Sequence, residues 1–354
     1  MIVEGYKISH LHLDQLHDSR PSWTLPDMTS DLASPHLHST PIPNSPPHTT
    51  IHRMADDMTT RLTNLRALLP TLESALDSFT SSPSKFRIVR TINPTSTPPK
   101  TLYILDSSFN PPSRAHLSLA TSALTEGADE RPHRLLLLFS THNADKAPSP
   151  ASFAQRIALM TVFAEDISRV LKADAGVPSV VQDVAIDIGL TKEPYYTDKS
   201  IAITTTTPPA YPTAPPHIHL IGYDTLTRFC NAKYYTASPP LSALAPFFDA
   251  GHRLRVTLRP SDAGDASSQA YGGVAEQEAY LRALREGERE AEGFRREWGE
   301  RIELVGDGEG VGVSSTRVRA AAGKGEWGLV GGLCSEGVSG WIRDQGLYGE
   351  EMVG

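Results

Sequence analysis

Short apolar runs alternate with longer amphipathic segments along most of the chain. The apolar runs predict buried strands at Leu102–Leu105 and Arg134–Ser140, and an alternating pattern predicts a third strand at Val180–Ile188. Further strands are predicted at His217–Ile221, Arg253–Arg259 and Ile302–Val305. Between them, apolar residues at helical spacing predict helices, at Pro150–Lys172 and Pro194–Ile203 among others. Strands that are apolar throughout and alternate with helices predict an α/β fold, a doubly wound and mostly parallel sheet with helices on both faces.

The chain before these strands has a different pattern. Residues 1–53 are rich in Pro, Ser, Thr and His and have no period, which predicts a disordered tail. Leucines at helical spacing within Met58–Phe79 predict an N-terminal helical segment over residues 54–85, kinked or divided at Pro70. Phe86–Arg90 alternates between apolar and polar residues and predicts an edge strand.

The remaining sequence, residues 86–348, is expected to form the main domain. An insertion is expected within it over residues 261–299. Ser261–Gly273 is rich in small and polar residues and predicts a flexible loop. Glu276–Trp298 is highly charged and has only a partial apolar stripe, which favours a solvated helix covering the domain.

A loop with candidate chemistry follows the first buried strand. Ser107–His116 connects Leu102–Leu105 to a predicted helix, so unpaired N–H groups and the positive end of the helix dipole point at whatever binds there. Ser113 and His116 are three residues apart, which places both side chains on one face of the first helical turn. This arrangement predicts an anion site with a hydroxyl and an imidazole beside it.

A second loop of similar character lies far downstream. Val313–Arg319 follows the glycine-rich residues 306–312 and leads into an alanine-rich helix. Arg319 lies three residues after Thr316, where its planar fork can grip phosphate oxygens. Both loops are expected beyond the carboxyl ends of parallel strands, where such sheets bind ligands. Together they predict a nucleotide site.

The two loops resemble the signatures of the nucleotidylyltransferase superfamily. Residues 107–116, S-S-F-N-P-P-S-R-A-H, are similar to G-x-F-x-P-x-[HT]-x-x-H, and residues 313–319, V-S-S-T-R-V-R, to I-S-S-T-x-x-R. Gly222-Tyr223-Asp224 is similar to the family's G-x-D element, and Asn143–Lys146 follows the second buried strand. The resemblance covers residues 86–348 and is closest to the eukaryotic nicotinamide mononucleotide (NMN) adenylyltransferases, particularly their divergent fungal relatives.

The resemblance implies a Rossmann-like fold and adenylyl transfer from ATP to NMN, giving NAD and pyrophosphate. Magnesium would be held mainly through the phosphates, with no dedicated metal site in the protein. His116 and Arg319 would be the catalytic residues, and Lys146 would bind the phosphate of the acceptor. The nucleotide and its phosphates would be bound by Ser108, Phe109, Asn110, Ser113, Gly222, Asp224, Ser314, Ser315 and Thr316.

Other interpretations of these residues remain open. Asp224 is equally consistent with a helix N-cap, and Lys146 with an ordinary surface lysine. Tyr195 and Tyr196 favour packing over base stacking, and the aromatic residue that stacks on nicotinamide in the family has no clear counterpart. Ser107 stands where the signature has glycine, and Ser113 where it has histidine or threonine.

Two alternative functions follow. One is a cytidylyltransferase acting on a phospho-alcohol, although the last signature of that group resembles R-T-x-G-I-S-T-S and residues 310–317 read G-V-G-V-S-S-T-R. The other is a nucleotide-binding regulatory protein whose catalysis has weakened or been lost, as the substitutions at Ser107 and Ser113 would allow.

Composition limits the partners and the setting. The chain of 354 residues has 33 Lys and Arg against 41 Asp and Glu, a formal net charge of −8, which argues against nucleic-acid and anionic-membrane binding. The longest purely apolar run, Leu135–Phe139, is too short to span a bilayer. The two cysteines, Cys230 and Cys334, are far apart in sequence, which favours a reducing, intracellular setting, cytoplasmic or nuclear. The oligomeric state stays open.

Overall fold

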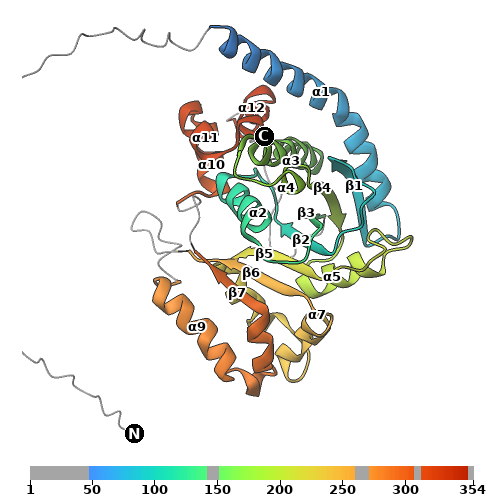
Figure 1. Cartoon of the computed structure of the whole chain (residues 1–354), viewed down its shortest axis with the longest axis vertical. Helices are drawn as coiled ribbons and strands as arrows, with labels where there is room; N and C mark the ends of the chain where they lie inside the picture. The colour runs from blue at the N-terminus through green and yellow to red at the C-terminus, as the bar shows by residue number, and fades with distance from the viewer. Residues whose placement is uncertain (1–47, 142–150, 260–270, 307–311, 350–354) are drawn as a thin grey trace, which may run out of the picture. The chain divides into compact units, whose positions relative to one another are not determined.

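The computed structural model describes residues 48–141, 151–259, 271–306 and 312–349, with side chains from Asp57 onward. These residues form a seven-stranded sheet in the order β1-β4-β3-β2-β5-β6-β7 (Figure 1). β1 is antiparallel to β4, and every other neighbouring pair is parallel. The strands are β1 (Phe86–Ile92), β2 (Thr101–Asp106), β3 (His133–Ser140), β4 (Ala185–Thr191), β5 (His217–Gly222), β6 (Arg253–Thr257) and β7 (Ile302–Val305).

Strand order reverses between β2 and β5. From β2 the chain proceeds through β3 to β4 on one side, and from β5 through β6 to β7 on the other. Such a reversal leaves a crevice beyond the carboxyl ends of the two adjacent strands, where doubly wound folds bind ligands. The predicted α/β fold with a mostly parallel sheet is confirmed, and its switch point lies between β2 and β5.

Alternation along the central strands sorts their side chains onto two faces. Tyr103 and Leu105 face one apolar core, whereas Leu102 and Ile104 face another. The first core is covered by α1 (His48–Thr80), α2 (Arg114–Glu126), α3 (Phe153–Ala173), α10 (Ser315–Gly323), α11 (Trp327–Leu333) and α12 (Glu336–Asp344). The opposite face packs on α5 (Tyr196–Thr205).

A further apolar cluster surrounds the β5–β7 side of the sheet. Its side chains come from β5, β6 and β7 and from the helices that follow them, and Phe248 stacks on Trp298 with ring centroids 5.2 Å apart. The helices are α6 (Tyr223–Phe229), η1 (Ala232–Tyr234), η2 (Pro240–Leu244), α7 (Ala245–Asp249), α9 (Val274–Glu286), η3 (Glu290–Glu292) and η4 (Arg296–Arg301).

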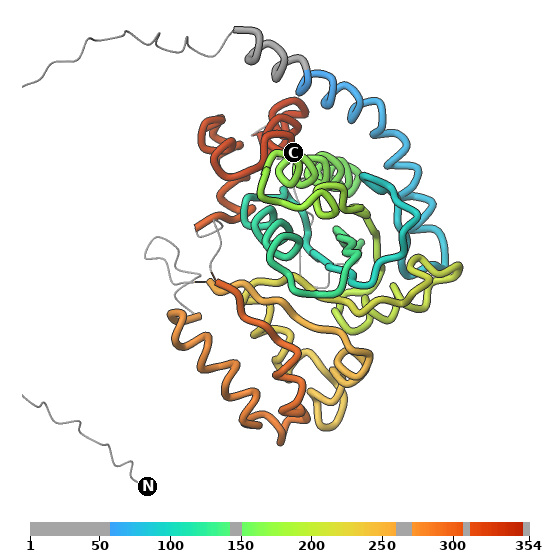
Figure 2. The backbone as a smooth tube through the Cα atoms, viewed as in Figure 1, coloured from blue at the N-terminus to red at the C-terminus, as the bar shows by residue number. Residues whose placement is uncertain are grey.

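The N-terminal helical segment is one continuous helix. α1 contains Pro70 in its interior, so the predicted division there is wrong, and the blue tube of α1 winds along the outside of the sheet without a break (Figure 2). Pro70 is exposed, whereas Leu65, Leu72 and Phe79 pack against the core. The helix begins at His48, earlier than the expected start at residue 54; residues 1–47 of the predicted tail lie outside the described residues.

Two other boundaries differ from the prediction. Residues 180–182, expected in a strand, lie in the short helix α4 (Ser179–Gln182), and β4 begins only at Ala185, where pairing with Arg134 of β3 starts. The helix expected over 276–298 ends at Glu286, because Gly287 adopts φ 89° and closes it in the left-handed conformation.

The segment expected as an insertion has a topological role. Its described part, with α9 and η4, connects β6 to β7, which lie parallel and adjacent in the sheet. Such a pair requires a crossover, and α9 supplies it. Residues 260–270 of the predicted loop lie outside the described residues.

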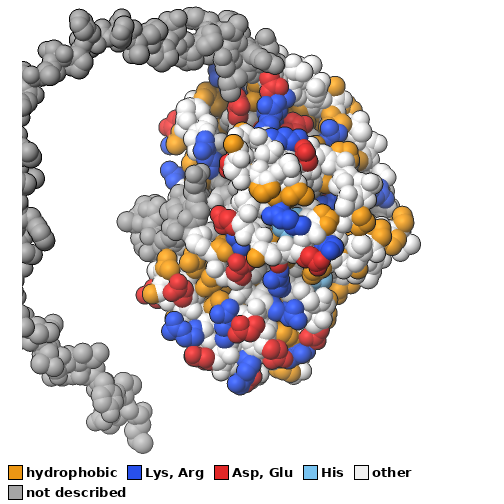
Figure 3. Space-filling view, in the orientation of Figure 1, with side chains coloured by type: hydrophobic (Ala, Val, Ile, Leu, Met, Phe, Trp, Pro, Cys, Tyr) orange, Lys and Arg blue, Asp and Glu red, His pale blue; other side chains and the backbone are white. Residues whose placement is uncertain are grey.

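The described surface and helices can be compared with the expectation that the chain binds neither nucleic acid nor membranes. Acidic and basic side chains are interspersed over the face shown in Figure 3, around the α9 side of the domain in particular. Among the described helices, none combines the length and apolar character that crossing a bilayer requires.

Candidate functional site

The loop after β2 forms the first half of the candidate site. Ser113 is the N-cap of α2, and its backbone N–H donates to His116 Nδ1 at 3.1 Å. The hydroxyl of Ser113 lies 2.9 Å from the same nitrogen, and that of Ser107 lies 2.9 Å from His116 Nε2. The imidazole therefore joins the two ends of the loop. The predicted proximity of Ser113 and His116 is present in the structure.

These contacts assign the tautomer of His116. Because Nδ1 accepts from a backbone N–H, the proton of the neutral ring lies on Nε2, which donates to Ser107 Oγ. Part of the residue remains accessible to solvent, but burial of the ring lowers the pKa of His116 from 6.5 to about 4. His116 is thus a neutral hydrogen-bond donor at physiological pH.

Phe109 anchors this loop in the apolar core. Its backbone has φ 44°, in the left-handed region that bulky residues rarely adopt, and its side chain is fully buried. The ring lies against His116, with centroids 5.7 Å apart, and against Phe163 of α3. Burial of the ring in the core stabilises the strained backbone and positions the imidazole above it.

The second loop lies directly against the first. Arg319 of α10 donates through Nη1 to the carbonyl of Asn110 at 2.7 Å and through Nη2 to Thr316 Oγ1 at 3.1 Å. Ser315 Oγ donates to the carbonyl of Pro111 at 2.8 Å. Ser314 caps α10 by accepting from the N–H of Arg317 at 3.3 Å. The two sequence signatures, far apart in the chain, therefore form one cluster.

Further contacts hold the first loop. Tyr348 donates through its hydroxyl to Asn110 Oδ1 at 2.9 Å, and Cys334 Sγ lies 3.4 Å from the carbonyl of Pro112. Asn110 and Ser113 are buried. The loop is thus fixed by Cys334, which caps the end of α11, and by Tyr348, which follows α12; the sequence did not indicate these contacts.

The G-x-D element lies across the switch point, after β5. Gly222 is the N-cap of α6, so Asp224 stands within the first helical turn and the N-cap interpretation of Asp224 is wrong. Its carboxylate pairs with Arg228 at 2.6 Å on the same helix. A Cβ at residue 222 would lie 2.8 Å from Asp224 Oδ1, so Gly222 leaves room for that carboxylate in its present position.

A cavity of about 330 Å³ opens between these elements, within the range of small-molecule sites. Its lining includes Ser107 and Ser108 from the first loop and Thr225 and Arg228 from α6. Aromatic side chains make up much of the remainder: Phe139, Tyr195, Tyr196, Phe229, Tyr234 and Tyr235. The cavity therefore combines flat apolar walls with polar groups at the switch point.

A buried ion pair forms one side of this cavity. Lys199 of α5 pairs with Asp106 at the end of β2, and both side chains are almost wholly buried. The ring of Tyr196 lies under Lys199, with the ammonium 5.2 Å from its centroid. Burial, and then the nearby carboxylates of Asp106 and Asp224, raise the pKa of Tyr196. Its phenol is therefore a neutral donor.

Several of these residues were missed by the sequence analysis. Asp106, Lys199, Arg228 and the tyrosines after α6 line the cavity, yet none belongs to a recognised signature. A signal was present in Tyr234-Tyr235, an aromatic pair of the same kind as Tyr195-Tyr196. Lys146, the predicted acceptor-binding residue, lies outside the described residues.

The acidic, histidine and cysteine side chains bear on metal binding. Within the described ranges, His, Cys, Asp and Glu side chains form no group of three or more that could hold an ion. The carboxylates at the site, Asp106 and Asp224, are each engaged by a cation.

Comparison with known proteins gives the following similarities. No family model matches the chain. It is 30% identical over 248 residues to a fission yeast protein, from Schizosaccharomyces pombe, named "Putative nicotinamide mononucleotide adenylyltransferase". That match covers 70% of this chain and 84% of the yeast protein.

Solved structures of Plasmodium falciparum nicotinic acid mononucleotide adenylyltransferase also match, one complexed with NaAD and one with APC. Each is 11% identical with a TM-score of 0.40, covering 70% of this chain and 97% of the other.

Proposed function

This chain belongs to the nicotinamide mononucleotide adenylyltransferase family of the nucleotidylyltransferase superfamily, and on that premise we propose that it transfers the adenylyl group of ATP to NMN. The observation that carries the proposal is the junction of the two signature loops, through Arg319 and Asn110, beside an aromatic cavity at the switch point. The products are NAD and pyrophosphate.

The reaction asks for positioning and charge stabilisation. A phosphate oxygen of NMN attacks the α-phosphorus of ATP, the bond from that phosphorus to the bridging oxygen breaks, and pyrophosphate leaves with the bonding electrons. The attacking phosphate is already ionised at neutral pH, so no strong general base is required. A site of hydroxyls, one neutral imidazole and guanidinium groups fits this need.

The proposal assigns roles to the imidazole of the first signature loop and to the polar residues of the second. His116 exchanges its Nε2–H bond from Ser107 Oγ to a phosphate oxygen, where it stabilises the charge that develops as pyrophosphate departs. Arg319 and the N-terminus of α10, with Ser314, Ser315 and Thr316, bind the polyphosphate. Ser107 thus serves as the resting partner of the imidazole.

The cavity is proposed as the site of the acceptor's base. Tyr195 and Tyr235 offer aromatic faces on which a pyridine ring can stack. Lys199 and Arg228 are neutralised by Asp106 and Asp224, so the described lining of the cavity presents no unpaired cation that would favour a carboxylate. We therefore expect the neutral nicotinamide ring to be preferred over nicotinate.

Magnesium would be bound chiefly through phosphate oxygens. The carboxylates nearest the cavity are paired with Lys199 and Arg228, which leaves phosphate and water as the natural ligands. When bound, the ion would neutralise part of the polyphosphate charge.

The test is NAD formation from NMN and ATP by the purified full-length protein. His116→Ala should lower kcat/KM by about 10²-fold or more, because it removes a donor to a developing charge. His133→Gln is the matched control: this histidine lies at the start of β3 and bonds the carbonyl of Asp129, so the activity per folded molecule should stay the same.

The same assay separates the alternatives. Replacing NMN with nicotinate mononucleotide should lower kcat/KM if the cavity discriminates as proposed. Turnover of CTP with a phospho-alcohol, and none with ATP and NMN, would establish the cytidylyltransferase instead. If the protein bound ATP but released no pyrophosphate with any mononucleotide, the result would support a nucleotide-binding regulatory protein instead of an enzyme.

A further inference from the structure

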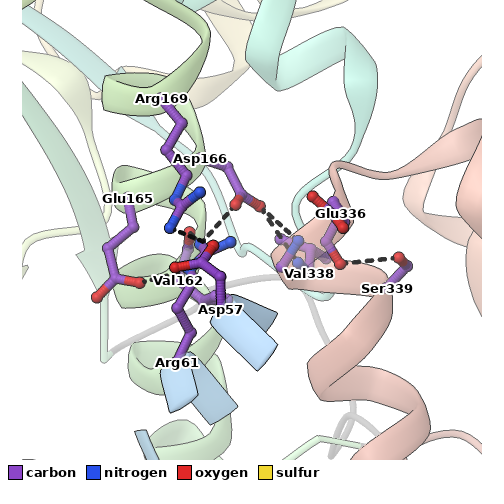
Figure 4. A network of polar contacts seen from close by, with 10 residues as sticks. Asp57, Arg61, Val162, Glu165, Asp166, Arg169, Glu336, Val338 and Ser339 are labelled. Atoms are coloured by element: carbon purple, nitrogen blue, oxygen red, sulfur yellow. Dashed lines mark hydrogen bonds and ion pairs between the residues drawn. The ribbon is translucent and has the colours of Figure 1, made fainter. Parts of the chain in front are cut away.

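Three arginines in the described part of the chain have less than a tenth of their surface exposed: Arg61 at 8%, Arg156 at 4% and Arg255 at 6%. Arg61 pairs with Asp166 at 2.6 Å and with Glu165 at 3.3 Å (Figure 4). Arg255 pairs with Glu126 and Glu303. Arg156, the most buried of them, has no carboxylate partner among the described residues.

The contacts of Arg156 leave most of its guanidinium unused. Nε donates to the carbonyl of Ala151 at 3.1 Å, and the rings of Phe139 and Phe153 lie 5.6 Å and 5.3 Å from its central carbon. A guanidinium carries five N–H donors, and these contacts satisfy one of them with an oxygen. Ring contacts compensate only partly for taking a charge out of water.

The position of Arg156 adds to this imbalance. It stands in the first turn of α3, where the helix dipole disfavours a cation. Burial lowers the pKa of Arg156, and the positive charge of Arg319 lowers it further, while Tyr348 acts in the opposite direction. Arg156 and Arg319 are therefore two cations within electrostatic reach of each other, and neither is paired with a carboxylate among the described residues.

The surroundings of Arg156 join it to the signature loops. Tyr348, which interacts with Arg156, donates to Asn110 Oδ1, and the carbonyl of Asn110 accepts from Arg319. On its other side Phe139, whose ring Arg156 covers, lines the aromatic cavity. Arg156 thus lies between the phosphate-binding loops and the proposed acceptor cavity.

We propose that Arg156 is an anion-binding residue of this site, whose free Nη groups donate to a phosphate oxygen that Arg319 approaches from the other side. The missing counter-charge of the isolated protein is then the phosphate of the bound substrate or product. The inference rests on the proposed function for the identity of that phosphate, but the binding it predicts is testable with pyrophosphate alone.

A purely structural role for Arg156 makes a different prediction. If the residue only pins the carbonyl of Ala151 and fills space between two phenylalanines, its loss should destabilise the fold and leave anion affinity unchanged. If it is a buried cation awaiting an anion, a methionine there should leave the unliganded protein at least as stable and weaken anion binding.

The experiment measures binding of inorganic pyrophosphate to the full chain by calorimetry, together with thermal unfolding. Arg156→Met should raise the dissociation constant by about tenfold or more, because a charge-assisted hydrogen bond is lost. Its unfolding temperature without pyrophosphate should not fall. Arg255→Met is the matched control, since Arg255 is as buried but paired, and it should bind pyrophosphate like the wild type.

Unchanged pyrophosphate affinity in Arg156→Met would overturn the proposal. Should that variant not fold, Arg156→Lys decides: a loss of affinity of about threefold or more supports the guanidinium contact, and wild-type affinity overturns it. The outcome is independent of the proposed reaction. A protein that forms no NAD but whose pyrophosphate binding depends on Arg156 would refute the function and keep this inference.

Discussion

Two regions of the molecule treat buried arginine in opposite ways. Where α1 packs on α3 and α12, Arg61 is surrounded by acceptors: the carboxylates of Glu165 and Asp166 and the carbonyl of Val162 (Figure 4). Asp166 in turn accepts from the backbone N–H groups of Gly337 and Val338, at 3.0 Å and 3.3 Å. At the switch point, Arg156 and Arg319 contact only neutral acceptors within the described residues.

The difference separates structural charge from functional charge. Where a buried ion pair is complete in the isolated protein, removing either partner strongly destabilises the fold, because the remaining charge is left buried and unpaired. Cations without a counter-ion contribute little to folding, and they gain their partner only when an anion binds. The first region should therefore respond to mutation through stability, and the second through binding and turnover.

The largest effect is expected at Arg61. Arg61→Met leaves Asp166 without its cation in a buried site and should cost about 3–5 kcal/mol of unfolding free energy. Urea denaturation would measure it, with Arg66→Met as control, because Arg66 is an exposed arginine of the same helix that pairs with Asp344 and should matter far less. Equal losses for both variants would contradict the assignment of Arg61 as a structural charge.

Arg319 should show the opposite behaviour. Arg319→Met should lower kcat/KM for ATP by about 10²-fold, near 2.7 kcal/mol of transition-state stabilisation, with little change in unfolding temperature. Its neighbour Arg317 is exposed and bonds the carbonyl of Gly312, so Arg317→Met should retain near wild-type activity. A stability loss in Arg319→Met as large as that of Arg61→Met would break the comparison.

The exposed ion pair at the edge of the contacts around Arg61, Glu165 and Asp166 should contribute least to stability. Asp57 of α1 pairs with Arg169 at 2.6 Å, and both side chains are about half exposed. Solvent screens such pairs, so Asp57→Asn should cost less than about 1 kcal/mol in the same urea experiment. A cost close to that of Arg61→Met would mean that the network acts as one unit.

The protonation state of His116 should not change near neutral pH. Burial depresses its pKa from 6.5 to about 4, so in the folded protein the ring stays neutral from pH 8 down to about pH 5. Its contribution to stability is complete above pH 6.5 and is lost as the pH falls toward 4, because the unfolded chain binds the proton more readily. Imidazole resonances followed by NMR, assigned with His116→Ala, would test this, and a midpoint near 6.5 would contradict it.

Local sequence pattern was sufficient to predict the order of the strands along the chain and the positions of the two signature loops. The apolar runs at β2, β3 and β5 predicted a parallel sheet, because only strands buried on both faces are apolar throughout. Ser113 and His116 could be placed together because they are three residues apart at a helix start, where an N-cap residue contacts the third residue of the helix. Local pattern failed at residues 180–182, where a helical turn replaces the start of a strand.

The sequence by itself thus determined the α/β fold class, the strand order along the chain and the two loops that meet at the switch point. Only the tertiary structure decided that Asp106 neutralises Lys199, that aromatic residues from separate elements line one cavity, and that Arg156 is buried without a carboxylate partner among the described residues. The physical reason is range: helix and strand periods are set by neighbours in the chain, whereas the charge balance of a buried group depends on elements that only folding brings together.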